Sequence, residues 1–261
     1  MSQTNLIISD SSGFYDDAMV RSTAVDTYTN VRNSATSNFQ SNSGSIIGVF
    51  HGHLGFNSAA NKMISRGQLA FDIKSNVSDT EQAFFITKGD TVLSAVLQLS
   101  LSATTTGFIA NTNFGSTHGA KFDFSSDTFG TTTSFDNFVG HVSSGSYSGN
   151  VTEYFTAFSN ANGGNKNVAL NSTGISDIQT IVNAGSSSTQ GRLGIVLINS
   201  SDFTDSNYQP DPTGGFFFVV QHGMQFSSSE SPSSTLRPKL ILTTETPSGD
   251  IQNSILFGTS F

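Results

Sequence analysis

Residues 93–102 read Leu-Ser-Ala-Val-Leu-Gln-Leu-Ser-Leu-Ser, and this stretch decides the fold class. Its apolar side chains alternate with mostly hydroxylated ones, which gives the period of two that a half-buried β-strand requires. Clusters of Asn, Ser and Gly, which are typical of turns, separate similar runs elsewhere in the chain. These runs predict strands at residues 25–31, 46–51, 68–73, 192–198, 216–220 and 240–244. The pattern indicates an all-β protein with roughly nine to eleven strands.

The alternation also assigns faces to the strands. In residues 93–102 the odd-numbered positions, from Leu93 onward, form the expected apolar face. In residues 68–73 the expected apolar face consists of Leu69, Phe71 and Ile73. Residues 192–198 are apolar on nearly every position, which indicates a strand that is buried on both sides.

One helix stands out among the strands. Its apolar residues at helical spacing are Ile175, Ile178, Ile181 and Val182. Ser176 and Gln179 fit the spacing of a capping box at its start, and Gly185 can provide a left-handed stop. A helix of about ten residues is long enough to cover an edge or an opening of a β core.

The composition excludes several function classes. The chain of 261 residues has 11 Lys and Arg against 19 Asp and Glu, so it lacks the basic surface of a nucleic-acid-binding protein. It has no Cys, which excludes disulfides, thiolate chemistry and Cys-based zinc sites. No run approaches the ~20 apolar residues of a membrane span. A hydrophobic content of 35% is nevertheless sufficient for a folded core.

The N-terminus and the surface composition suggest where the protein works. The first residues carry no basic region, and the apolar run at 6–8 is too short for a signal peptide. Only 11% of the residues are charged, and Ser, Thr, Asn and Gly take over the role of solvating the surface. Such a surface is typical of proteins that face the environment. We therefore expect a virion component that is made in the host cytoplasm, or a surface protein that is exported by a non-classical route.

The chain divides into three expected parts. An N-terminal segment covers residues 1–24, a β-sandwich covers 25–244, and a C-terminal tail covers 245–261. Within the sandwich, residues around 104–149 are rich in Gly, Ser, Thr and Phe. We interpret them as an insertion of hairpins or long loops.

Five blocks follow one another in a recognisable order. They are residues 26–28 (DTY), 66–73 (RGQLAFDI), 88–99 (KGDTVLSAVLQL), the helical turn 178–184 with the strand 193–197, and 226–242 from FSSSES to RPKLIL. This arrangement resembles the DNRLRE type of jelly-roll β-sandwich domain, which is similar to carbohydrate-binding modules. The resemblance implies two packed antiparallel sheets and a module that binds glycans or other subunits. The Trp that the family often has after the helical turn is missing here.

Two clusters could hold a metal ion. His51 and His53 would place two imidazoles on one strand face, which is half of a metal site; the alternative is two polar residues at a strand edge. Asp202, Asp205 and Asp211 cluster in a turn whose oxygens could hold Ca²⁺. The EF-hand pattern is missing, and such side chains also stabilise turns by themselves. We therefore expect no cofactor, with structural Ca²⁺ as the alternative.

No catalytic signature is present in the sequence. Glu230 and Arg237, together with Arg66, are expected to form ion pairs that fix the final strand. A glycosidase would need two carboxylates, such as those of Glu230 and Asp72, on either side of a sugar; the scarcity of acids argues against this. The Gly-x-x-x-Gly stretch at 145–149 has Tyr where a nucleophile elbow has its Ser. We expect that the protein is not an enzyme.

The Phe residues of the middle segment allow two interpretations. Most of them can be core residues, and some can form an interface between subunits, where aromatic residues are enriched. The predicted interface residues are Phe129, Phe135, Phe138, Ile255, Leu256, Phe257 and Phe261. The expected partners are other virion subunits and copies of the same chain.

These observations predict a non-enzymatic virion structural protein, a bacteriophage capsid decoration or accessory subunit. The alternative is a carbohydrate-binding or receptor-binding module of a phage fibre or surface protein. Sugar platforms usually use Trp and Tyr, and the chain has no Trp and 5 Tyr, which weakens this alternative.

Overall fold

The described part of the chain consists mainly of β-strands. The computed structural model describes residues 2–7, 17–24, 28–37, 39–41, 44–54, 61–73, 86, 89–101, 109–110, 116–126, 129–158, 164–184, 191–205 and 219–247. The strands are β1 (Ser2–Ile7), β2 (Asp17–Ala24), β3 (Phe39–Ser41), β4 (Ile46–Leu54), β5 (Asn61–Asp72), β6 (Thr91–Ser100), β7 (Ile109–Ala110), β8 (Thr117–Lys121), β9 (Glu153–Phe158), β10 (Asn165–Ala169), β11 (Arg192–Asn199), β12 (Val219–Ser227) and β13 (Lys239–Glu245). The helices are α1 (Tyr28–Arg32), α2 (Ser172–Ala184) and α3 (Ser200–Phe203), with 3-10 turns η2 (Phe124–Ser126) and η3 (Thr132–Ser134).

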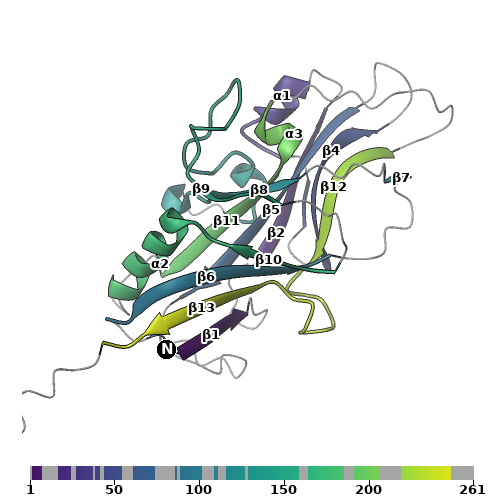
Figure 1. The fold of residues 1–261 in the computed structure, drawn as a ribbon. Helices are drawn as coiled ribbons and strands as arrows, with labels where there is room; N and C mark the ends of the chain where they lie inside the picture. Colours follow the sequence, from purple (N-terminus) through teal and green to yellow (C-terminus); the bar gives the residue numbers. More distant parts are fainter. Residues whose placement is uncertain are drawn as a thin grey trace, which may run out of the picture.

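These strands form two sheets (Figure 1). The smaller sheet has the order β1-β13-β6-β10, and the larger has the order β7-β12-β4-β5-β11-β8-β9. Strand β2 also pairs with β5, and β3 pairs with β2. All pairings are antiparallel except the short one between β7 and β12. The prediction of an all-β sandwich of two antiparallel sheets is confirmed. Its jelly-roll connectivity stays a prediction.

The long strand β5 is the branch point of the larger sheet. It pairs with β2 over residues 62–69, with β4 over 61–65 and with β11 over 67–72. Because a strand has only two edges, β4 and β11 share the edge opposite β2. The neighbour changes between Ser65 and Gly67, so Arg66 lies where the sheet divides.

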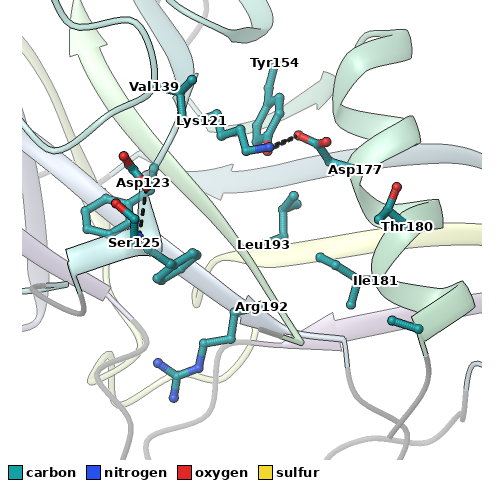
Figure 2. Close-up of a pocket in the computed structure, with 13 residues that line it drawn as sticks. Lys121, Asp123, Ser125, Val139, Tyr154, Asp177, Thr180, Ile181, Arg192 and Leu193 are labelled. Atoms are coloured by element: carbon teal, nitrogen blue, oxygen red, sulfur yellow. Dashed lines mark hydrogen bonds and ion pairs between the residues drawn. The ribbon is translucent and has the colours of Figure 1, made fainter. Parts of the chain in front are cut away.

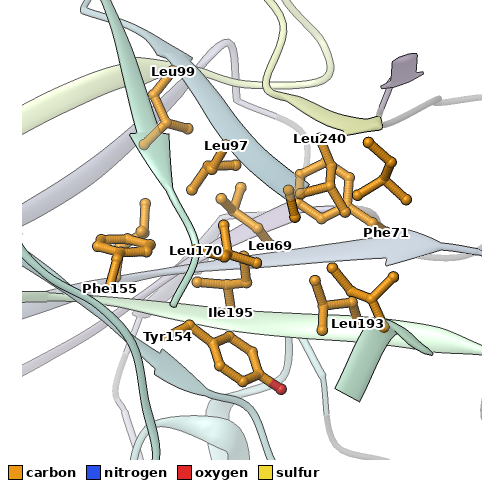
Figure 3. Close-up of a cluster of buried hydrophobic side chains, with 14 of the residues drawn as sticks. Leu69, Phe71, Leu97, Leu99, Tyr154, Phe155, Leu170, Leu193, Ile195 and Leu240 are labelled. Atoms are coloured by element: carbon orange, nitrogen blue, oxygen red, sulfur yellow. The ribbon is translucent and has the colours of Figure 1, made fainter. Parts of the chain in front are cut away.

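The main core lies between the two sheets (Figure 3). Leu69 and Phe71 of β5 and Ile195 of β11 face Leu97 of β6 and Leu240 of β13, and all five are at most 2% exposed. The face predicted for residues 68–73 is therefore confirmed. Helix α2 closes one side of this core with Ile178 and Val182.

The opposite face of the larger sheet is also buried. A second cluster joins Val196 and Ile198 of β11 to aromatic side chains from residues 122–147, and a third joins Ile64 of β5 to Phe135 and to α1. Residues 122–126 and 129–147, which lie between β8 and β9 in the chain, thus cover this face of the sheet. This explains why β11 is apolar on both faces, as the sequence predicts.

Strand β6 departs from its predicted face at one end. Leu93 is 40% exposed, whereas its neighbour Val92 is 6% exposed. The pairing with β13 skips Leu93, because Thr243 lies opposite Ser94 and Thr244 lies opposite Val92. Such a β-bulge inserts one extra residue and reverses the alternation beyond it. A period of two in the sequence cannot show where a bulge interrupts it.

The strand predicted at residues 25–31 is wrong for its second half, which forms helix α1. Tyr28, Val31 and Arg32 are buried at spacings of three and four, while Thr29 and Asn30 are exposed. That is the periodicity of a helix, and a stretch of seven residues is too short to distinguish it from alternation.

The predicted helix is present and longer than expected, but its predicted cap is wrong. Helix α2 has 13 residues, and the side chain of Asn171 accepts a hydrogen bond from the amide of Gly174, 3.1 Å away. Asn171 is therefore the N-cap. Gln179 has a different role, since it accepts from the Val92 amide at 2.7 Å and donates to the Asp90 carbonyl at 2.9 Å. It ties the helix to the start of β6.

The sandwich is larger than the predicted residues 25–244. Residues 2–7 pair with β13 and residues 17–24 pair with β5, so most of the predicted N-terminal segment belongs to the sheets. Strand β13, the last one in the described residues, ends at Glu245, one residue beyond the prediction. Of the strand predicted at 216–220, the structure describes Val219 and Val220, which begin β12. In the described residues, no helix has the length and apolarity needed to span a bilayer.

Two leucines of β6 provide a matched test of this packing. Leu97→Ala should lower the free energy of unfolding by about 2–5 kcal/mol, because it removes a fully buried side chain and leaves a cavity. Leu93→Ala should cost less than about 0.5 kcal/mol, because Leu93 lies on the bulge and faces solvent. Urea titration of both variants measures the difference. Equal losses would contradict the bulge.

Candidate functional site

A pocket of about 430 Å³ opens between helix α2 and the end of strand β8 (Figure 2). Helix α2 contributes Asp177, Thr180 and Ile181 on one side, and Asp123 and Ser125 lie across from them. The other lining residues are Lys121, Phe122, Phe124, Val139, Tyr154, Ala184, Arg192 and Leu193. In volume it falls within the usual range of small-molecule sites, about 300–1,000 Å³.

The wall formed by residues 121–125 is held against β11. The amide of Phe122 donates to the carbonyl of Gly194 at 3.0 Å, and the Asp123 side chain accepts from the amide of Ser125 at 2.9 Å. A Cβ atom at Gly194 would lie 2.6 Å from the ring of Phe124. A glycine is therefore required where this segment crosses the strand.

Asp177 is fixed by two donors. The Oδ2 atom of Asp177 lies 2.9 Å from Nζ of Lys121 and accepts a hydrogen bond from the Tyr154 hydroxyl at 2.8 Å. Burial, and secondly the hydrogen bond to Asp177, raise the pKa of Tyr154, so this phenol keeps its proton and acts as a donor. The carboxylate thus has a defined position at the rim of the pocket.

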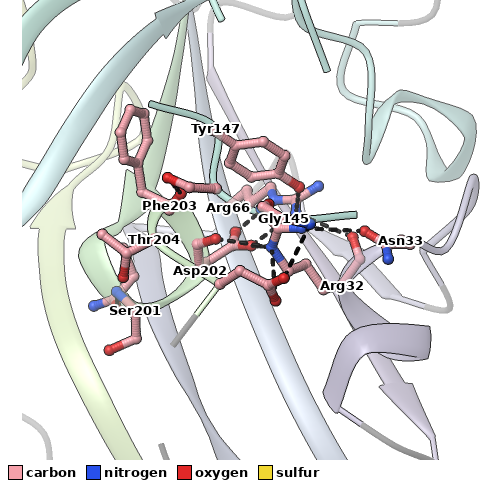
Figure 4. A network of polar contacts seen from close by, with 12 residues as sticks. Arg32, Asn33, Arg66, Gly145, Tyr147, Ser201, Asp202, Phe203 and Thr204 are labelled. Carbon is pink, nitrogen blue, oxygen red and sulfur yellow. Dashed lines mark hydrogen bonds and ion pairs between the residues drawn. The ribbon is translucent and has the colours of Figure 1, made fainter. Parts of the chain in front are cut away.

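A second group of polar residues lies on the face of the larger sheet that points away from the smaller sheet (Figure 4). Arg66 forms a bidentate pair with Asp202, with Nε 2.8 Å from Oδ2 and Nη2 3.0 Å from Oδ1. Arg66 also donates to the carbonyl of Phe135 at 2.8 Å and to the hydroxyl of Tyr147 at 3.0 Å. Arg32 lies beside them, with Nε 3.3 Å from Oδ1 of Asp202. We call Arg32, Arg66, Tyr147 and Asp202 the charge cluster.

All three charged residues of the charge cluster are completely buried. Burial is the largest single influence and would lower the pKa of Arg66, but Asp202, Tyr147 and Tyr28 together more than offset it, and the net direction is upward. Burial raises the pKa of Tyr147 to about 12. The charge cluster therefore holds a protonated phenol at neutral pH beside the buried Arg66–Asp202 ion pair.

Two acids of the turn that could hold Ca²⁺ lie at the charge cluster. Asp202 points into the charge cluster, where two guanidinium groups neutralise it. Asp205 lies 3.9 Å from Nε of Arg32 and has a positive φ of 57°, and Asp211 lies outside the described residues. The side chains of His51 and His53 also lie outside them. Within the described part of the chain, no three His, Asp or Glu side chains are grouped as metal ligands.

The predicted ion pair at the final strand is replaced by other contacts. Arg66 binds Asp202 and not Glu230. Nε of Arg237 donates to the carbonyl of Ser231 at 3.1 Å, and Oε2 of Glu230 is buried without a hydrogen-bond partner. Closeness in the sequence was a poor guide to these contacts. The partner of Arg66 is 136 residues away, in a part of the chain that the sequence did not link to it.

The predicted interface residues of the middle segment lie in the interior. Phe129, Phe135 and Phe138 are 6%, 0% and 4% exposed, and they pack in the clusters behind the larger sheet. These side chains are core residues of their own chain and offer no surface to a partner. The other four predicted interface residues, Ile255, Leu256, Phe257 and Phe261, lie outside the described residues.

The residues of the pocket were not identified from the sequence. Lys121, Tyr154 and Asp177 are far apart in the chain and fit no motif, and only the fold brings them together. No model of a known protein family matches this chain, and no curated protein matches it either. The geometry of the pocket is therefore the basis for a functional interpretation.

The charge cluster predicts a large effect of a small substitution. Asp202→Asn should lower the free energy of unfolding by about 3–5 kcal/mol, because two buried guanidinium groups lose their counter-ion. Asp177 forms a more exposed ion pair with Lys121. Asp177→Asn should therefore lower the free energy of unfolding by less than about 1 kcal/mol. Urea denaturation compares them. Similar losses for both variants would show that the charge cluster does not govern stability.

The lowered pKa of His141 predicts that the stability of the fold depends on pH. Burial, together with the charges of Arg66 and Arg32, lowers the pKa of His141 from 6.5 to about 4. Between these values the unfolded chain binds the proton and the folded chain does not, so stability falls as the pH drops through this range. The melting temperature of the wild type should fall more between pH 7 and pH 4 than that of His141→Gln. Parallel pH profiles would contradict this assignment.

Proposed function

We propose that the chain is a non-enzymatic structural protein of a bacteriophage virion, a capsid decoration or accessory subunit. In this role it binds neighbouring virion proteins and further copies of itself. The charge-poor composition and the β-sandwich support the proposal. It would be made in the host cytoplasm and assembled onto the particle.

The main support comes from where the charged side chains are used. Arg32, Arg66 and Asp202 are fully buried in the charge cluster. The partly exposed ion pair Lys121–Asp177 joins β8 to α2, and the hydrogen bond between His118 and Glu153 joins β8 to β9. These charged side chains hold strands and helices of the fold together. A chain with 11% charged residues that uses them in this way is suited to a rigid building block.

The C-terminal tail is the segment that we propose to contact a neighbouring subunit. Strand β13 ends at Glu245 and already has neighbours on both edges, β1 and β6. Residues 246–261, which include Ile255 and Phe257, are therefore not needed to complete the smaller sheet. An added strand on a neighbour would use backbone hydrogen bonds for affinity and such side chains for specificity.

Truncation after Glu245 tests this proposal. The shortened chain should keep the melting temperature of the full chain, because both sheets remain intact, and should lose self-association and co-sedimentation with phage capsids. Light scattering and pelleting measure the two properties. A sharp drop in melting temperature with unchanged association would assign the tail to its own fold. A full chain that stays monomeric and never pellets with capsids would overturn the structural role.

A second candidate function is a carbohydrate-binding or receptor-binding module of a phage fibre or surface protein. The observation that favours it is the pocket beside α2, which combines hydrogen-bonding and apolar side chains. The two candidates differ in one measurable property, since only the second requires reproducible binding to a class of glycan.

A further inference from the structure

The pocket beside α2 has an apolar base and a polar rim. Leu193, Ile181 and Phe124 supply apolar surface, and Asp177, Thr180, Asp123 and Ser125 supply oxygen atoms. Figure 2 shows the acidic groups on opposite sides, with Leu193 between them. A purely apolar ligand would bury the rim without hydrogen bonds, which is costly. The lining therefore suits a ligand with both hydroxyl groups and C–H surface.

The charges of the lining select against ionic ligands. The pocket is lined by two acidic residues, Asp123 and Asp177, and two basic ones, Lys121 and Arg192, so its formal charge is zero. An anion would meet carboxylates on both sides, and a cation would meet Lys121 beside one of them. A neutral ligand that donates and accepts hydrogen bonds avoids both conflicts.

The rim is positioned before any ligand arrives. Lys121 and Tyr154 both contact Oδ2 of Asp177, and in the described part of the chain neither contact involves Oδ1. That oxygen is left to accept a hydroxyl group, and Lys121 has further N–H donors. Groups that are already oriented lose little conformational entropy on binding.

Phe124 supplies an aromatic surface next to these polar groups. It is partly exposed and packs against Phe122 and Phe129, with ring centroids 4.9 Å and 6.0 Å away. The face of an aromatic ring carries negative charge density, which attracts the C–H groups on the face of a sugar ring. The segment that carries Phe124 is fixed against β11 at Gly194.

We infer that this pocket binds one neutral pyranose unit of a glycan, with its hydroxyl groups on Asp177, Lys121 and Asp123. The C–H face of the sugar lies on Phe124 and the apolar base. This inference rests on the second proposed function and names its site and its ligand class. A single unit in a pocket of this size binds weakly, and many copies on a particle would supply the avidity.

Two arginine substitutions on α2 test the site. Thr180→Arg places a long side chain in the pocket, whereas Thr173→Arg makes the same change on an exposed position of the same helix outside the lining. The full chain and both variants are applied to an array of neutral and acidic glycans, and melting temperatures confirm folding. We expect binding to neutral glycans that Thr180→Arg weakens by about tenfold or more, or about 1.4 kcal/mol, and that Thr173→Arg leaves unchanged. Asp177→Asn should weaken it as well.

Each other outcome overturns a defined part of the inference. Binding that survives in Thr180→Arg would place the glycan elsewhere and leave the second function intact. Binding to acidic glycans alone would reject the neutral ligand class. A full chain that binds no glycan would reject both the pocket assignment and the second function, and the virion role would stand on its own test.

Discussion

A guanidinium group can be buried in a protein only if a counter-ion and hydrogen-bond acceptors are placed around it. Arg66 lies where β5 exchanges β4 for β11, and the acceptors come from segments that are distant in the sequence. Asp202 supplies the carboxylate, and Phe135 and Tyr147 supply further oxygens. The division of the larger sheet, the position of α3 and the path of residues 129–147 all depend on this one requirement.

The charge cluster also explains why the larger sheet has two buried faces. One face packs against the smaller sheet through aliphatic residues. The other is covered by residues that the Arg66 contacts hold in place, and this cover carries most of the aromatic side chains of the second cluster. The pocket beside α2 lies at the end of β8, so its walls belong to the cover on one side and to the main core on the other. A rigid sheet thus positions the rim.

The sequence identifies the strands better than the contacts between them. Alternation locates β5, β6 and β13, and a continuous apolar run locates β11, which is buried on both faces. It does not detect the bulge at Leu93 or the single turn at Tyr28, since both are local exceptions to a short pattern. The charge cluster and the pocket are beyond sequence reasoning of this kind, because their residues meet only through long-range pairing.

The order of the cluster residues along the chain has a consequence for folding. Arg66 and its partner Asp202 are separated by 136 residues in the sequence. Arg32 donates a hydrogen bond to the carbonyl of Asp202, which is 170 residues further along the chain. On the ribosome both arginines emerge long before the acid that neutralises them. Until then β5 cannot bury Arg66 without an uncompensated charge, so the larger sheet must close late, in a slow step of high contact order. A chain cut short before Asp202 would lack this counter-ion, and its larger sheet would stay open and exposed to proteases.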